Sequence, residues 1–194
     1  MEQPEEKTIN LKKFDISLIE FDKNEKIICE IRKHYVGLFA TLLTGLLVAV
    51  ILFVTIIVLA VVITGIPDEG VVNQNLALNI AYGIGALVVL GTIFATFVGG
   101  YIYQHNVMLV TSDKIAQVLY KTIFDRKVSQ LSITDIQDVT VIQSGIFPRI
   151  FNYGTITIET AGEQQNYTFT YAPQPYVRAK DIISAHELHE AENS

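Results

Sequence analysis

Two long uncharged runs of apolar residues dominate the middle of the chain. The first covers residues 35–64 and the second about residues 76–103. About 20 apolar residues are enough for a helix to cross a hydrocarbon core that is roughly 30 Å thick. A pair of buried helices in a soluble protein is the alternative. The length of both runs and their lack of charge favour a transmembrane helical hairpin over residues 35–103.

The segment that joins the two runs, residues 65–75, is short and contains Asp68 and Glu69 but no Lys or Arg. Basic residues lie instead on the outer flanks of the two runs. They are Arg32, Lys33, Lys114, Lys121, Arg126 and Lys127. Cytoplasmic flanks of membrane helices are enriched in Lys and Arg. The sequence therefore predicts a multi-pass protein of the plasma (inner) membrane, with both termini in the cytoplasm and the 65–75 loop outside.

Small residues recur at four-residue spacing in both apolar runs. The rows are Gly37, Thr41, Gly45 and Ala49 in the first run, and Gly91, Ala95 and Gly99 in the second. Such rows allow two helix backbones to approach closely in lipid. They favour a helix-packing contact, either within the hairpin or between protomers. The plain alternative is that Gly and Ala are simply common in membrane helices.

The hydrophobic period changes after the second apolar run. From Asn106 onward, short apolar or alternating segments are separated by turn signals such as Ser112-Asp113 and Ser144-Gly145, which is typical of short antiparallel strands. A helical pattern follows over about residues 174–190. We therefore expect an α+β cytoplasmic domain over residues 104–190, with six or so strands and then one helix, and a tail over residues 191–194.

The first 34 residues form a cytoplasmic N-terminal segment of mixed charge, and such a charged start is not typical of a signal peptide. Residues 26–33 fit either a strand added to the sheet or the cytoplasmic start of the first membrane helix. The segment also contains several apolar side chains, namely Phe14, Ile16, Leu18 and Phe21. We expect part of residues 8–25 to pack on the domain or to lie at the membrane interface.

Overall composition narrows the possible partners. The chain of 194 residues carries 14 basic and 20 acidic side chains, a net charge of −6. No segment is strongly basic, so we expect no nucleic-acid partner. Cys29 is the single cysteine, which excludes a disulfide framework and fits a structural thiol in a reducing compartment.

The sequence shows no constellation of catalytic or metal-binding residues. His186 and His189 share a helix face, but the zinc-protease signature requires two histidines four residues apart. We interpret this pair as part of a solvated helix end. His34 and His105 flank the apolar runs, where an interfacial position is expected. No glycine-rich phosphate loop is present, so we expect a non-enzymatic protein without metal or cofactor.

An ordered series of motifs carries a resemblance to a known family. The motifs are Glu30-Ile31-Arg32-Lys33-His34, Val110-Thr111-Ser112-Asp113-Lys114-Ile115, Ile136-Gln137-Asp138-Val139, Phe151-Asn152-Tyr153-Gly154 and Ile158-Glu159-Thr160-Ala161-Gly162-Glu163. Over about residues 26–185 the chain resembles the bacterial pleckstrin-homology (PH) membrane proteins of the YdbS-like type. The resemblance implies a strongly bent β-barrel of about seven strands, capped by a C-terminal helix and tethered by the membrane hairpin.

The basic residues depart from the pattern of eukaryotic lipid-binding PH domains, which hold phosphoinositides with a basic cluster around a long first hairpin loop. The corresponding turn here is Ser112-Asp113, with only Lys114 beside it. We expect no phosphoinositide binding. Two smaller basic groups remain candidates for contact with anionic lipid headgroups, with ordinary surface and topology charges as the alternative. They are Arg32 and Lys33, and then Lys121, Arg126 and Lys127.

These patterns favour one function and leave two others open. The leading hypothesis is a membrane-anchored PH-like domain that serves as a non-enzymatic binding or scaffold module at the cytoplasmic face. Its partners would be the lipid bilayer and either another protein or further copies of the chain. The alternatives are an anionic-lipid-sensing module and a small transport or channel subunit. The apolar runs contain no charged residue with which to build an ion pathway.

Overall fold

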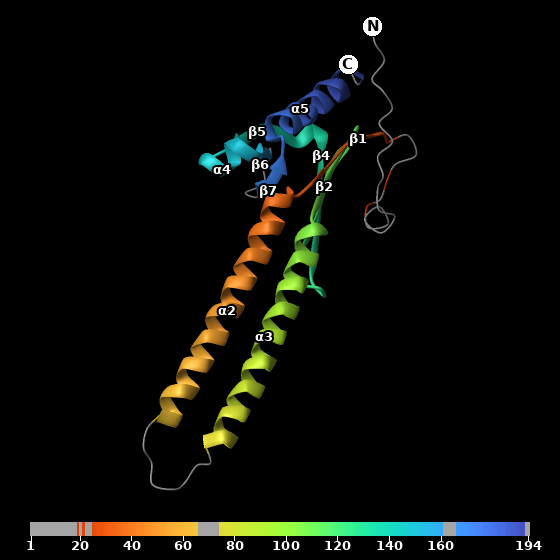
Figure 1. The fold of residues 1–194 in the computed structure, drawn as a ribbon. Coiled ribbons are helices and arrows are strands. Elements are labelled where there is room, and N and C mark those ends of the chain that lie inside the picture. The colour runs from red at the N-terminus through yellow and green to blue at the C-terminus, as the bar shows by residue number, and fades with distance from the viewer. Residues whose placement is uncertain (1–18, 20, 22–24, 66–73, 161–165, 193–194) are drawn as a thin grey trace. The chain divides into compact units, whose positions relative to one another are not determined.

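The computed structural model describes residues 19, 21, 25–65, 74–160 and 166–192 (Figure 1). The chain divides into two compact units. The first contains the residues up to Val36 and those from Ile102 onward, and the second contains Gly37–Tyr101. We call them the sheet unit and the helix pair. The expected outside loop lies almost entirely outside the described residues.

The first sheet of the sheet unit has four antiparallel strands. They are β1 (Ile27–Arg32), β2 (Val107–Thr111), β3 (Lys114–Tyr120) and β4 (Arg126–Ser132), in the order β1-β2-β3-β4 (Figure 1). Residues 26–33 therefore contribute a strand, the first of the two possibilities that the sequence left open. Since β1 pairs with β2, the chain segments before and after the helix pair are neighbours in one sheet.

The second sheet has three antiparallel strands in the order β5-β6-β7. They are β5 (Ile136–Ile142), β6 (Tyr153–Thr160) and β7 (Tyr167–Pro173). A 3-10 helix, η1 (Ile133–Asp135), leads into β5, and α5 (Pro175–Glu192) follows β7 as expected. A short helix, α4 (Ile146–Phe151), joins β5 to β6 and was not predicted.

The expected closed barrel is not formed, although the class is α+β as predicted. The seven strands make two separate ladders, because η1 turns the chain out of the first sheet before β5 begins. Side chains bridge the sheets instead. The buried Gln117 of β3 donates from Nε2 to the carbonyl oxygen of Thr168 in β7, at 2.9 Å.

The main core lies where both sheets and α5 meet. Its fully buried members alternate along the strands, as the period-2 pattern requires. They include Ile31, Met108, Val110, Ile115, Ile156, Ile158, Phe169 and Ile182. Cys29 is buried in the same cluster, and burial raises the pKa of its thiol to about 12.

Strand β2 is buried on both faces. Antiparallel strands commonly have one face toward the core and the other toward water. Val107 and Leu109 point away from the main core into a second cluster. Ile19 and Phe21 of the N-terminal segment contribute to this cluster. Part of residues 8–25 thus packs on the domain as predicted; Phe14, Ile16 and Leu18 lie outside the described residues.

The histidines of α5 are not part of a solvated helix end, so that interpretation was wrong. Nδ1 of His186 lies 2.8 Å from the carbonyl oxygen of Ile133, and Nδ1 of His189 lies 3.0 Å from that of Ser112. These hydrogen bonds fix the end of α5 to η1 and to the β2–β3 turn. The described residues contain no group of three side chains that could hold a metal ion.

The helix pair consists of α2 (Tyr35–Gly65) and α3 (Gln74–Gln104). In the most apolar window of each helix, only 11% of α2 and 6% of α3 is buried. Threonine hydroxyls along the pair donate to carbonyl oxygens one turn earlier, for example Thr96 to Thr92 at 2.7 Å. These hydroxyl groups therefore have hydrogen-bond partners within their own helix.

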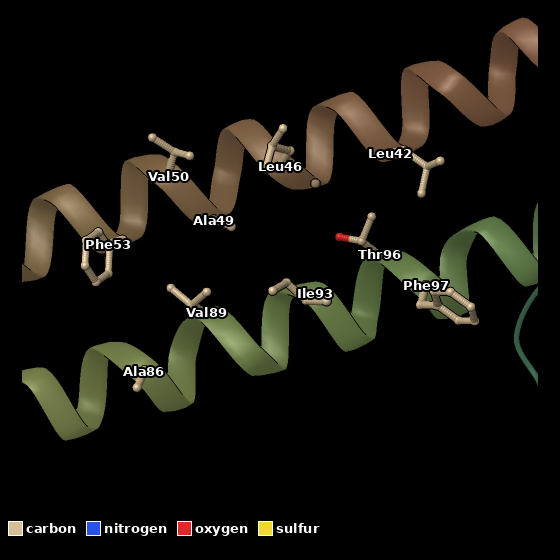
Figure 2. A pocket seen from close by; sticks show the side chains of 11 residues that line it. Leu42, Leu46, Ala49, Val50, Phe53, Ala86, Val89, Ile93, Thr96 and Phe97 are labelled. Atoms are coloured by element: carbon tan, nitrogen blue, oxygen red, sulfur yellow. The ribbon is translucent and has the colours of Figure 1, made fainter.

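Close packing of the two helices centres on Gly45. A methyl group at this position would lie 2.8 Å from Cβ of Thr96 and still closer to its outer atoms. Figure 2 shows Thr96 pointing from α3 toward α2. On α2, the predicted row of Gly37, Thr41, Gly45 and Ala49 is buried or half-buried throughout.

On α3 the row that meets α2 is shifted from the one that the sequence indicated. Gly91 and Ala95 are exposed, and a methyl group at Gly91 would meet no atom within 4 Å. Gly99 is half-buried, and a methyl group there would lie 3.6 Å from Cγ2 of Thr41. The closest approaches belong to Thr96 and to Gly100, where a methyl group would lie 3.2 Å from Cδ1 of Leu38.

An open groove of about 530 Å³ runs beside this contact (Figure 2). Its lining is aliphatic and aromatic apart from Gly45 and Thr96. The other members are Leu42, Leu46, Ala49, Val50, Phe53, Ala86, Val89, Ile93 and Phe97. Such a lining offers no hydrophilic route, so the groove gives no support to a channel.

Replacing Gly45 should loosen the helix pair, whereas Gly91 should tolerate the same change. Gly45→Leu places a side chain on Thr96, and overpacking of this kind costs about 1–3 kcal/mol. We expect a lower melting temperature in detergent for Gly45→Leu and an unchanged one for Gly91→Leu, the matched control. A Gly45→Leu protein as stable as the wild type would contradict the packing.

The buried Cys29 thiol should be unreactive in the folded protein. With a pKa near 12, almost no thiolate exists at pH 8, and the thiolate is the nucleophile. We expect modification by iodoacetamide, followed by mass spectrometry, to be at least about 100-fold slower in the native protein than in denaturant. Equal rates in the two states would show that Cys29 is accessible.

Candidate functional site

The strand register brings both links to the helix pair to one end of the sheet unit. Arg32, the last residue of β1, pairs with Val107, the first residue of β2. We call this the junction end. It also holds the turn between β3 and β4, because Val107 pairs with Val118, two residues before the end of β3 at Tyr120. The β2–β3 turn at Ser112-Asp113 lies at the opposite end.

At the junction end, the backbone of His34 makes hydrogen bonds to two other elements. Its backbone N–H donates to the carbonyl oxygen of Tyr171 at 2.7 Å, which ties the edge of the first sheet to β7. Its carbonyl oxygen accepts a hydrogen bond from the hydroxyl of Tyr103, also at 2.7 Å. The residue before α2 is thus bound both to the second sheet and to the end of α3.

Aromatic rings surround this junction. The ring of His34 stacks on Tyr153, with 5.5 Å between centroids, and Tyr153 stacks on Tyr171 at 5.3 Å. Tyr103 meets Tyr171 edge to face at 5.9 Å. Offset and edge-to-face pairs of this kind stabilise contacts beyond the burial of their area. The rings form a rigid wall between the two sheets at the junction end.

Burial and contacts within the sheet unit surround the basic side chains of Lys33 and His34. Burial lowers the pKa of Lys33, whose Nζ donates to Oγ1 of Thr170 at 3.3 Å and lies 5.2 Å from the centroid of the Tyr103 ring. Burial also lowers the pKa of His34, and its Nδ1 accepts the N–H of Val36 at 3.2 Å. These contacts fix both side chains within the sheet unit.

A cavity of about 240 Å³ lies beside the aromatic wall. It is lined by Ile142, Ser144, Pro148, Tyr153, Gly154, Thr155, Thr170 and Tyr171. Glycine is required at position 154, because a methyl group there would lie 2.8 Å from the carbonyl oxygen of Ile142. The cavity is smaller than the roughly 300–1,000 Å³ of most small-molecule sites.

Tyr171 reaches this wall through a β-bulge. Its φ of 57° is left-handed, and the register between β6 and β7 shifts at this point. A bulge redirects the side chain that it carries. The cluster of His34, Tyr103, Tyr153 and Tyr171 was not predicted, since its members come from four separate segments. The Tyr residues that recur at segment ends were the one sequence feature that could have indicated this cluster.

The two basic groups predicted from the sequence have different surroundings. Arg32 pairs with Glu30, and Lys33 is engaged with Thr170 and Tyr103. The other three side chains are exposed on the β3–β4 hairpin. They are Lys121, Arg126 and Lys127. The register places both groups at the junction end, which their separation in the sequence did not reveal.

Comparisons with known proteins agree with the motifs. The sequence model of the family described as "Bacterial PH domain" matches residues 35–190. Among solved structures, the chain is similar to the crystal structure of a DUF1696 family protein with a pleckstrin-homology domain from Shewanella loihica PV-4. The identity is 14% and the TM-score 0.33, over 42% of this chain and 70% of that chain.

That structural likeness is too low to carry an argument, and the comparison with curated proteins finds no match. The family match decides the assignment, since it covers most of the chain, including α2, α3 and all strands except β1. This chain therefore belongs to the bacterial PH domain family, as its motifs predicted.

Proposed function

We propose that this protein is a PH domain anchored in the plasma membrane by α2 and α3, where it acts as a non-enzymatic binding or scaffold module at the cytoplasmic face. The apolar surface of the helix pair carries the proposal. Large side chains such as Leu46, Leu87 and Phe97 are exposed along both helices. A bilayer would remove this surface from water, at about 25 cal/mol per Å² of apolar area.

A soluble core helix and a signal sequence both fit these two helices less well than a membrane anchor does. A core helix of a soluble protein is mostly buried, whereas only 11% and 6% of the most apolar windows of these two helices are buried. A signal sequence has a short apolar core of about 7–15 residues near the N-terminus. Here the first apolar helix has 28 residues in its candidate span and follows a strand that belongs to the sheet unit.

Features of the sheet unit support a binding role. The titratable side chains at the junction are engaged in structural contacts, and no metal-binding group occurs among the described residues. Strand β4 ends the order of the first sheet and is largely exposed. The Gln130 carbonyl oxygen accepts the Tyr167 hydroxyl at 3.3 Å, and no further strand of the described residues pairs with β4 on this side. Such an edge can bind a partner by strand addition. We therefore propose β4 as the protein-binding surface.

The anchor predicts resistance to alkaline extraction and a defined topology. Because the native Cys29 is buried, labelling of a single introduced cysteine reports on which side of the membrane that position lies. We expect an impermeant maleimide to label Asp68→Cys on intact cells, and Leu188→Cys only after permeabilisation. The wild-type protein is the unlabelled control. Release of the wild-type protein into the carbonate supernatant would refute the anchor.

The binding role predicts a specific neighbour at β4. A photo-crosslinking amino acid at the exposed Gln130 of β4 should give one defined adduct in cells, with another protein or with a second copy. The same probe at the exposed Glu187 of α5 is the matched control and should give none. Absence of any adduct at Gln130, or equal adducts at both positions, would count against strand addition.

A further inference from the structure

Two apolar projections of the sheet unit stand out from its surface. The turn between β3 and β4 carries Ile123 and Phe124, and Phe124 is 97% exposed. The short helix α4 exposes Ile146, Phe147 and Ile150. Large apolar side chains gathered in this way usually mark an interaction surface. The question is which occupant fits both projections.

The β3–β4 turn projects at the junction end. Strand β3 continues two residues past Val118, the partner of the first residue of β2. At about 3.3 Å per residue, the turn therefore reaches beyond the start of β2. The hairpin is held there by Asn106, whose Oδ1 accepts the N–H of Tyr120 at 2.6 Å, and by the contact of the His105 and Tyr120 rings.

Helix α4 projects at the same end. It connects the end of β5 to Tyr153, the first residue of β6, and Tyr153 stacks on His34 at the junction. Nε2 of Gln143 donates to the carbonyl oxygens of Pro148 in α4 and of Tyr153, at 2.8 and 3.2 Å. The backbone of α4 is thus joined through Gln143 to Tyr153, which contacts the link between β1 and α2.

The charges near these projections favour an anionic surface. Lys121, Arg126 and Lys127 flank the β3–β4 turn and are exposed, with Asp125 as the acid between them. Arg149 is exposed on α4. Apolar side chains bordered by basic ones are the pattern of segments that lie in the interface of an anionic membrane.

We propose that the junction end docks on the anionic cytoplasmic leaflet of the bilayer, with Phe124 and the apolar side of α4 inserted at the boundary of headgroups and acyl chains. The proposal rests on the proposed function, because α2 and α3 must span the bilayer. Only Lys33 and His34 link β1 to α2, and only His105 and Asn106 link α3 to β2. Such short links hold the junction end near the bilayer surface.

The chain contains no tryptophan, so a single introduced tryptophan reports its own surroundings. The test uses the full chain, reconstituted in vesicles of phosphatidylcholine and phosphatidylglycerol that contain lipids brominated at known depths. We expect Phe124→Trp and Phe147→Trp each to lose at least about half of their fluorescence. Bromines near the headgroups should quench more strongly than bromines near the bilayer centre.

Two control positions separate the possible failures. Leu188, 63% exposed against 65% for Phe147, lies at the opposite end, next to His189, which contacts the β2–β3 turn. Leu188→Trp should not be quenched. Phe94→Trp, exposed in the middle of α3, should be quenched by deep bromines. Quenching at Phe94→Trp without quenching at Phe124→Trp and Phe147→Trp would overturn the docking but keep the anchor. No quenching at Phe94→Trp would overturn the anchor itself.

The role of the basic side chains is tested in the same vesicles. Combined Lys121→Gln, Arg126→Gln and Lys127→Gln changes should at least halve the quenching of Phe124→Trp, whereas Lys180→Gln on α5 should leave it unchanged. Equal quenching of Phe124→Trp in purely neutral vesicles would overturn the recognition of anionic lipid. A blue-shifted emission that bromine does not quench would show that protein covers the turn, and would overturn the lipid contact.

Discussion

The link between the two sheets at His34 is the constraint on which the arrangement of the sheet unit depends. The sheets share no ladder, so their edges are joined at this end by the bond from the His34 N–H to the Tyr171 carbonyl. The hydroxyl of Tyr103, near the end of α3, donates to the carbonyl oxygen of the same residue. Loss of this contact would free the start of α2 from β7 and from the end of α3.

Several other features follow from this point. The bulge at Tyr171 is needed to bring its ring against Tyr153, and the small Gly154 allows β6 to pass close to Ile142 beside it. Burial of Lys33 and His34 at this point lowers the pKa of each. Exposed cations of the junction end lie around this point, on the β3–β4 hairpin and at Arg149 of α4.

The sequence could predict elements whose signal is local. The apolar runs, the alternation of Ile156 and Ile158, and the helix after Pro175 each follow from neighbouring residues. The sequence did not predict contacts between segments that lie far apart in the chain. Gly91 belongs to the spacing of a packing row but does not face α2, because the rotation of α3 is set by Thr96 against Gly45. His186 and His189 look like solvated positions until η1 and the β2–β3 turn are placed beside them.

By itself, the sequence determined the α+β class, the two apolar helices and membership of the bacterial PH family, since all three are expressed in local periodicity and ordered motifs. Only the tertiary structure decided that β1 completes the first sheet, that the strands form two sheets instead of a closed barrel, and that both basic groups share one end. The physical reason is register. Which residues of distant strands lie opposite one another depends on shared packing across the sheets, and no local pattern encodes it.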